Sequence, residues 1–233
     1  MFGPDLRARD EHLVELMDDP DCDPRRLNAT LRRFSLVNRL ISGWGTVYRH
    51  RLRPLIAGLE RPARILDLGS GGGDVVARLA SLAAADGFEV RWTGADPDPR
   101  AHEVAAAREI PNARFLCADA DALREAGETF DVVISNHVVH HLDAQGLHDF
   151  TEASRDLAAH RVLHGDIARG RLAYHLYSVG ILPLAPGTFL RTDGLRSIRR
   201  SHRPAELSAA LGPDWSVTSP APFRLLAEAD GRA

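Results

Sequence analysis

The chain has 233 residues, of which 44% are hydrophobic, and this is enough apolar material for one sizeable core. All 29 basic residues are arginine, so mechanisms that need a lysine amine, such as Schiff-base formation, are excluded. The formal net charge of -3 and the lack of a long basic run argue against nucleic acid as a partner, because backbone binding needs clustered cations.

The cysteines and the N-terminal residues indicate where in the cell the protein is located. Cys22 and Cys117 lie far apart in the sequence and suggest neither a disulfide framework nor a zinc module. The first residues are charged, and no apolar run approaches the roughly 18 residues that a membrane span needs. We therefore expect a cytoplasmic protein with no membrane span and a small-molecule partner. The sequence leaves the oligomeric state open.

The first 60 residues predict helices. Apolar residues recur at helical spacing from Leu27 to Ile41, and Asp23 followed by Pro24 supplies an N-cap and a first turn. Gly43 is expected to end this helix. We expect residues 1–60 to form a helical cap on a main domain at 61–233.

A second helical stretch carries an aromatic stripe. Trp44, Tyr48 and Leu52 follow one another at four-residue spacing and so share one face. This stripe is either a packing surface or one wall of a substrate site. In the second case Tyr48 is the residue that contacts the substrate.

From Arg64 onward, short apolar runs alternate with helical patterns. The runs are "RILDLG", "FEVRWTGAD", "ARFLCAD", "FDVVISN" and "HRVLHGDI". Helical stretches follow most of them, as at 74–85, 99–109 and 145–158. Strands that alternate with helices indicate a parallel sheet with helices on both faces. The predicted fold is therefore doubly wound α/β.

After Asp166 this rhythm breaks. The stretch at about 168–202 is apolar in its first half, and we expect it to be an insertion that covers the carboxyl ends of the strands, where substrate specificity usually resides. Tyr174 in this insertion is a candidate substrate contact. A short helix at 204–211 is followed by "WSVTSPAPFRLLAEA", which predicts two strands in a hairpin at the edge of the sheet.

The stretch "ILDLGSGGGD" carries the most chemistry. A dinucleotide fingerprint that starts at Gly69 and Gly71 would need a glycine where this chain has Asp74, and a phosphate loop would need a lysine. The turn also carries the carboxylate of Asp67, and carboxylates disfavour a pyrophosphate but favour a cation. A ligand with an amino group and a sulfonium, and without phosphate, fits better.

This stretch resembles the first motif of class I S-adenosylmethionine-dependent methyltransferases, and three later segments resemble further motifs in the expected order: "WTGADPDP", "FLCADADAL" and "FDVVISNHVVHHL". The resemblance implies a Rossmann-like sheet of seven strands with the last one antiparallel, and S-adenosyl-L-methionine as cofactor. In this family an acid after the second strand binds both ribose hydroxyls, and an acid after the third meets the adenine. The cofactor-binding residues that it implies are Asp67, Gly69, Ser70, Gly71, Asp96, Pro97, Asp119, Ala120 and Asn136.

Histidines supply candidates for a base. His137, His140 and His141 follow the fourth strand, and His164 and Asp166 end the fifth, which opens onto the same crevice. Imidazole suits proton uptake near neutral pH, so we predict His141 as the base, with His140 as the close alternative and Asp166 orienting it.

Other roles for these residues stay open. His137 is expected to contact the substrate, and any one of these histidines can instead simply pack or cap a turn. Asp166 can instead cap the helix expected near Arg169. No metal is expected, because the carboxylates are not at ligand spacing in the sequence.

The segments "LRRFSLVNRL" and "RTDGLRSIRR" are similar to those of bacterial methyltransferases associated with type III polyketide synthases and related to quinone biosynthesis. This similarity implies secondary metabolism and O-methylation of an aromatic polyketide or a quinone-like acceptor. C-methylation of a similar acceptor and a non-catalytic regulatory protein that binds S-adenosylmethionine are the alternatives.

Overall fold

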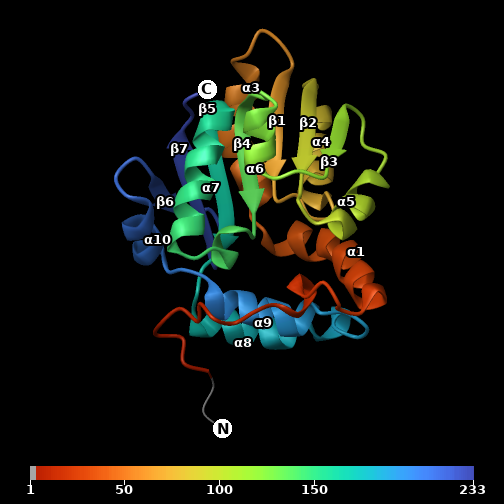
Figure 1. Ribbon diagram of the computed structural model, residues 1–233, viewed down its shortest axis with the longest axis vertical. Helices are drawn as coiled ribbons and strands as arrows, with labels where there is room; N and C mark the ends of the chain where they lie inside the picture. Colours follow the sequence, from red (N-terminus) through yellow and green to blue (C-terminus); the bar gives the residue numbers. More distant parts are fainter. Residues whose placement is uncertain (1–3) are drawn as a thin grey trace.

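The computed structural model describes residues 4–233, which are built around a seven-stranded sheet in the order β3-β2-β1-β4-β5-β7-β6 (Figure 1). Strands β1 to β5 pair in parallel, whereas β7 is antiparallel to both of its neighbours, β5 and β6. The predicted doubly wound fold, its antiparallel last strand and the terminal hairpin are confirmed. The strands are β1 (Ala63–Leu68), β2 (Val90–Ala95), β3 (Ala113–Leu116), β4 (Phe130–Asn136), β5 (Ala158–Ile167), β6 (Ser216–Thr218) and β7 (Arg224–Asp230).

The helices begin where the sequence supplies caps. Asp23 accepts hydrogen bonds from the backbone N–H groups of Arg25 and Arg26, and Pro24 occupies the first turn of α1, as predicted. The helices are α1 (Pro24–Ile41), α2 (Trp44–Val47), α3 (Arg53–Ala57), α4 (Asp74–Ala85), α5 (Pro99–Ala106), α6 (Ala120–Glu125), α7 (Ala144–Leu157), α8 (Arg171–Gly180), α9 (Leu190–Arg200) and α10 (Pro204–Leu211). A π-turn at Tyr48–Leu52 joins α2 to α3.

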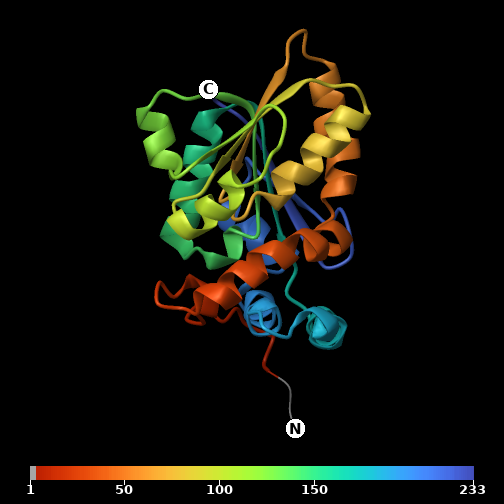
Figure 2. The ribbon, with the colours of Figure 1, turned by 90° about the vertical axis from the view of Figure 1, so that its right-hand side faces the viewer.

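Helices cover both faces of the sheet (Figure 2), and one apolar cluster lies on each face. On one face, α4 and the helical stretch at 44–57 pack against β1, β2 and β4. On the other, α6, α7 and α10 pack against the same sheet. Residues 44–57 thus belong to the core, so the helical cap that we expected over 1–60 is not a single unit.

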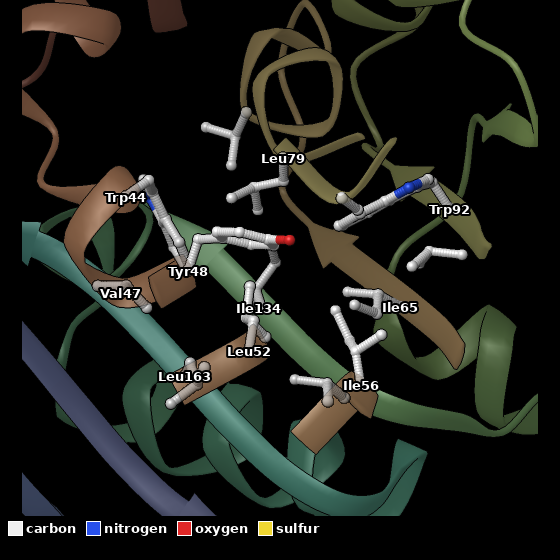
Figure 3. Packing of buried hydrophobic residues seen from close by; sticks show 14 of the residues in the cluster. Trp44, Val47, Tyr48, Leu52, Ile56, Ile65, Leu79, Trp92, Ile134 and Leu163 are labelled. Carbon is white, nitrogen blue, oxygen red and sulfur yellow. The ribbon is translucent and has the colours of Figure 1, made fainter. Parts of the chain in front are cut away.

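The aromatic stripe lies inside the first cluster (Figure 3). Tyr48 is 2% exposed, and its hydroxyl donates to Asp86 Oδ2 at 2.8 Å. Trp44 and Leu52 are buried beside it. The expectation that Tyr48 contacts the substrate is wrong, because its ring fills the core and does not line the large cavity described below.

A further layer lies across the carboxyl ends of the parallel strands. In Figures 1 and 2, α1, α8, α9 and the chain before α1 lie below the strand ends, although α8 and α9 follow α1 by about 130 residues or more in sequence. The stretch at 168–202 contains the two helices α8 and α9. Within residues 4–233, no helix is both long enough and apolar enough to span a membrane.

Candidate active site

The glycine-rich turn between β1 and α4 is fixed by the end of β2. The N–H groups of Gly69 and Ser70 donate to the carbonyl of Ala95 at 2.8 and 3.0 Å. The Gly71 N–H donates to Asp96 Oδ2 at 2.8 Å. The predicted first and second cofactor motifs are therefore joined directly by hydrogen bonds.

The three glycines of this turn serve different purposes, although all have positive φ. A Cβ on Gly69 would lie 2.5 Å from Val138, and one on Gly73 would lie 2.7 Å from the Phe115 ring. A Cβ on Gly71 would meet nothing within 4 Å. Protein packing therefore requires the glycine at Gly69, and of these three glycines only Gly71 faces open space.

The polar atoms beside this turn fit a cationic donor. Asp67 is 1% exposed, and its Oδ1 has no hydrogen-bond partner among the described residues; the same holds for Oδ1 of Asn136. Burial, together with the charges of Asp74 and Asp96, raises the pKa of Asp67 well above its usual range. Unpaired buried acceptors in an acidic setting match a ligand that carries an ammonium and a sulfonium, so S-adenosylmethionine fits the residues present.

The predicted adenine contacts follow Ala118, whose N–H donates to the Asp96 carbonyl at 3.2 Å. Asp119 is exposed and accepts a hydrogen bond from Ala122 N–H as the N-cap of α6. Neither Asp119 nor Ala120 lines the large cavity, whereas Asp96 and Pro97 do. The structure thus brings together seven of the nine predicted cofactor residues and leaves these two outside.

A cavity of about 1000 Å³ extends from the glycine turn to the layer of α1, α8 and α9. The glycine turn, Asp67, Asp96 and Asn136 line one end. Apolar side chains from the helices line the other, among them Phe34, Val37, Tyr177, Ile181, Leu184 and Leu190. The cavity is therefore polar and acidic at the predicted cofactor end and mainly apolar beyond it.

His140 lies buried between two carboxylates. Its Nδ1 is 2.7 Å from Asp166 Oδ1, and its Nε2 is 3.2 Å from Glu15 Oε1. Burial disfavours a charge on His140, but the two carboxylates outweigh it and raise the pKa of this imidazole to about 9. The His140 charge likewise holds the pKa of Asp166 well below its usual range, despite the burial of that carboxyl.

His141 lies beside this network and lines the cavity. Its side chain is 29% exposed, its Nδ1 is 3.2 Å from Asp18 Oδ2, and its Nε2 is 3.8 Å from Glu15 Oε1. The rings of His140 and His141 have centroids 4.2 Å apart. Asp18, and not Asp166 as predicted, is therefore the carboxylate beside His141.

The other predicted residues fall in different places. His137 lines the cavity with φ +64°, and its Nε2 accepts a hydrogen bond from Arg224 at 2.8 Å. His164 points away from the cavity, with Nδ1 2.7 Å from Ser135 Oγ and its ring stacked on Trp215, so it does not join the other histidines. Burial lowers its pKa to about 3.

Two expectations for the insertion and the fifth strand change. Tyr174 does not line the cavity, so its expected substrate contact is wrong; Tyr177, one helical turn later, lines it instead and donates to the Leu190 carbonyl at 2.7 Å. Asp166 does not cap α8, because its carboxylate is bound to His140 and the N-cap position of α8 is Gly170.

No sequence pattern pointed to the acids that the N-terminal segment and α9 contribute to the site. Glu15 also accepts from Ser197 Oγ at 2.6 Å, and Asp193 accepts from the N–H groups of Leu16 and Met17. Glu15 and Asp193 both line the cavity and are buried. Because Glu15 and His140 are 125 residues apart, no local spacing relates them.

Some of these groups also approach the geometry of a metal site. Glu15, His140 and His141 each place a ligand atom within 4.8 Å of the others, and so do His137, His140 and Asp166. We keep the prediction that no metal is required, because protonated His140 donates from Nδ1 to Asp166 and from Nε2 to Glu15, so both of its ring nitrogens are already used.

Known proteins share both the sequence pattern and the fold. Residues 65–161 match the family described as "Methyltransferase domain". The demethylmenaquinone methyltransferase of Chlorobaculum parvum is 26% identical over 169 residues, which cover 68% of this chain and 67% of the relative. The ubiquinone biosynthesis O-methyltransferase of Brucella anthropi is 33% identical over 156 residues, which cover 64% of this chain and 57% of the relative.

Solved structures agree in fold. The plantazolicin methyltransferase BpumL, in complex with SAH, superposes with a TM-score of 0.66 at 15% identity, over 95% of this chain and 96% of that one. The magnesium protoporphyrin IX methyltransferase of Synechocystis PCC 6803, with bound SAM, gives 0.51 at 17% identity, over 85% of this chain and 84% of that one. The matched domain and the named relatives indicate an S-adenosylmethionine-dependent methyltransferase, and the solved structures show that the chain shares the class I methyltransferase fold.

Proposed function

We propose that the enzyme methylates a hydroxyl group of a small aromatic acceptor of the polyketide or quinone type. The mainly apolar end of the cavity supports an aromatic acceptor, because it presents phenyl and branched aliphatic side chains from α1, α8 and α9. The names of two relatives, a demethylmenaquinone methyltransferase and a ubiquinone biosynthesis O-methyltransferase, support the same class.

The observation that carries O-methylation is the His141–Asp18 pair at the cavity wall. Asp18, 3.2 Å from Nδ1, favours the tautomer that carries its proton there, so that Nε2 is left to accept a proton from the acceptor hydroxyl. The bound cofactor supplies an electrophilic methyl group on a sulfonium. Our mechanism therefore assigns two tasks to the protein: aligning the acceptor with that methyl group and removing one proton.

His140 takes a different role from the one that the sequence suggested. Because Asp166 and Glu15 keep its imidazole protonated up to about pH 9, it is a poor base at neutral pH. We assign it to positioning: its backbone N–H and ring both bind Asp166, and its ring packs on that of His141. Asp166 acts on His140, and Glu15 links His140 to α9 through Ser197.

The test is His141→Ala, assayed by mass spectrometry on a panel of phenols, resorcinols and quinols. Loss of a general base should lower kcat by about 10²–10⁴-fold, whereas the calorimetric Kd for S-adenosylhomocysteine should stay within a factor of about three. His148→Ala, an exposed histidine on α7, is the matched control and should retain wild-type kcat. Near-wild-type kcat in His141→Ala would contradict a base at this position.

The site of methylation separates the two enzymatic alternatives. Fragmentation of the product locates the new methyl group on oxygen or on a ring carbon. A product methylated on carbon would change the assigned reaction from O-methylation to C-methylation. The assigned fold and cofactor site would not be affected. Cofactor binding without turnover of any acceptor would favour the third alternative, a regulatory protein that binds S-adenosylmethionine.

A further inference from the structure

Arg224, the first residue of β7, is a buried cation without a counter-ion. It is 4% exposed and lines the cavity. Among the described residues, no carboxylate lies within 4.0 Å of its guanidinium, since none of the ion pairs includes it. An unpaired charge costs several kcal/mol to bury, so a guanidinium kept in this state points to a ligand that completes its pairing.

Arg169, which is as buried as Arg224, shows what full pairing looks like in the same chain, whereas Arg200, at 8% exposed, has no carboxylate partner within residues 4–233 but donates to two backbone carbonyls. Arg169 donates to Glu206 Oε1 at 2.6 Å and to the backbone carbonyls of Leu6, Arg7 and Ser201. Arg224 donates only from Nε to the Ile41 carbonyl and from Nη1 to His137 Nε2. A guanidinium has five N–H donors, so three remain for a ligand, among them both on Nη2.

The position of Arg224 assigns these donors to the acceptor end of the cavity. It is bonded to the Ile41 carbonyl at the end of α1 and to His137. Burial lowers the pKa of Arg224, and Asp166 is the carboxylate whose charge opposes this effect. At the cofactor end, Asp74 and Asp96 are the acids whose charges act on Asp67. His137 cannot compensate the charge, because burial and Arg224 itself lower its pKa well below the usual value and leave it neutral.

We propose that Arg224 binds a carboxylate of the acceptor, so that the substrate is a hydroxylated aromatic acid. The planar fork of the guanidinium matches a carboxylate in two parallel hydrogen bonds, and this match fixes the orientation of the ring as well as its affinity. With the carboxylate held there, the ring lies along the apolar wall and a ring hydroxyl is directed toward His141. This inference rests on the proposed hydroxyl methylation.

The first experiment needs no variant. Calorimetry compares 2,4-dihydroxybenzoate with resorcinol, and salicylate with phenol, each titrated into the wild-type enzyme saturated with S-adenosylhomocysteine. Charge-assisted pairing should make each acid bind at least about tenfold more tightly than its matched phenol. Equal affinities within both pairs would overturn the proposal even if both phenols were methylated.

The second experiment locates the effect. Arg224→Met should remove the preference for the acid, and Arg224→Lys should restore it in part, because lysine keeps the charge without the fork. Arg39→Met, which removes a charge from an exposed position on the same cavity, should keep the preference. The melting temperature of each variant reports whether it is folded.

The same variants test whether Arg224 binds the carboxylate of the acceptor or the methionine carboxylate of the cofactor. In our proposal, Arg224→Met changes the Kd for S-adenosylhomocysteine by less than about threefold. A loss of more than tenfold, with the preference for acids retained, would assign Arg224 to the methionine carboxylate and overturn the proposal. No change in either affinity would make Arg224 structural. Failure to methylate any phenol, with acid binding intact, would refute the proposed function and not the carboxylate site.

Discussion

Asp96 already accepts two backbone hydrogen bonds, from Gly71 N–H and from Asp98 N–H at 2.9 Å, and still has room for a ligand. An ionised carboxylate offers about four acceptor sites, so roughly two remain for ribose hydroxyls. The chain therefore uses one side chain to shape the glycine turn and, in our assignment, to bind the cofactor.

Asp96→Ala should weaken binding of S-adenosylhomocysteine at least tenfold, because two charge-assisted hydrogen bonds of about 1.5–3 kcal/mol each are lost. Calorimetry measures the Kd. Asp98→Ala is the control: it removes the N-cap of α5, which costs about 1 kcal/mol of stability, but no cavity contact. Equal affinities of wild type and Asp96→Ala would refute the assignment.

Gly71→Ala tests the glycine that faces open space. At a φ of +51°, a residue with a Cβ has a backbone strain of about 1–2 kcal/mol. The new Cβ would also project into the cavity. Gly127→Ala is the matched control, since Gly127 has φ +67° and open space around it but does not line the cavity. Urea unfolding should show similar losses for both, and only Gly71→Ala should bind S-adenosylhomocysteine more weakly. If both variants bind it like wild type, the glycine serves the turn alone.

At the residue scale, the sequence predicted what local spacing encodes. The turn at Gly69–Gly71 and the acid after β2 are recognisable because the whole motif is contiguous. The roles of the histidines were not predictable, because protonation depends on neighbours from elsewhere in the chain. His140 was a candidate base until Glu15 and Asp166 were placed on either side of it.

At the scale of elements, the strands and the flanking helices α4, α5 and α7 were predicted to within a few residues, whereas the short helix α6 was not predicted. The periodicity of α1 and α4 and the apolar runs of β1 and β4 are local signals. The prediction of helix is wrong for the segment before α1: among residues 4–23 the chain forms irregular bends and turns along α9, with one 3-10 turn at Leu16–Asp18. Its shape is set by tertiary hydrogen bonds and not by its own periodicity.

Asp193→Ala tests whether this segment closes the acceptor end. Asp193 binds the backbone N–H groups of Leu16 and Met17, so its loss should release the residues that carry Glu15 and Asp18. We expect faster amide hydrogen exchange at these residues, a KM for the acceptor that is about tenfold higher, and a Kd for S-adenosylhomocysteine within about threefold.

Glu11→Ala is the control for this experiment, because Glu11 is an exposed acid of the same segment whose ion pair, with Arg9, stays within that segment. Glu11→Ala should leave both the amide hydrogen exchange of the segment and the KM for the acceptor unchanged. Unaltered exchange in Asp193→Ala would show that the segment is held by other contacts and that Asp193 does not fasten it.

At the scale of the whole molecule, the buried network makes stability depend on pH. The His140 pKa rises from 6.5 to about 9 on folding, so its contribution is complete below pH 6.5 and is lost as pH rises toward 9. The Asp166 pKa falls on folding, so its contribution is present above about pH 4 and is lost in acid. The network as a whole is strongest between these limits.

Urea unfolding of wild type and His140→Gln from pH 5.5 to 9.5 tests whether the stabilisation by His140 decreases as pH rises. The difference in unfolding free energy should shrink by about 3 kcal/mol across the window, with a slope of at most about 1.4 kcal/mol per pH unit. His164→Gln should behave oppositely, because the lowered pKa of His164 destabilises the fold only as pH falls below 6.5. A difference for His140→Gln that is constant with pH would mean that His140 is neutral.

The hydrogen bond between Ser197 and Glu15 has a consequence for folding during translation, because the two residues are 182 positions apart in the chain. At about 5–20 residues per second, the ribosome makes Ser197 roughly 10–40 s after Glu15. Strands β1 to β5 are all translated by Ile167 and can pair in that interval, whereas residues 4–18 can reach His140 and His141 but not yet α9. The nascent chain therefore holds its glycine turn before its cavity is closed, and the part of the site that is translated first is completed last.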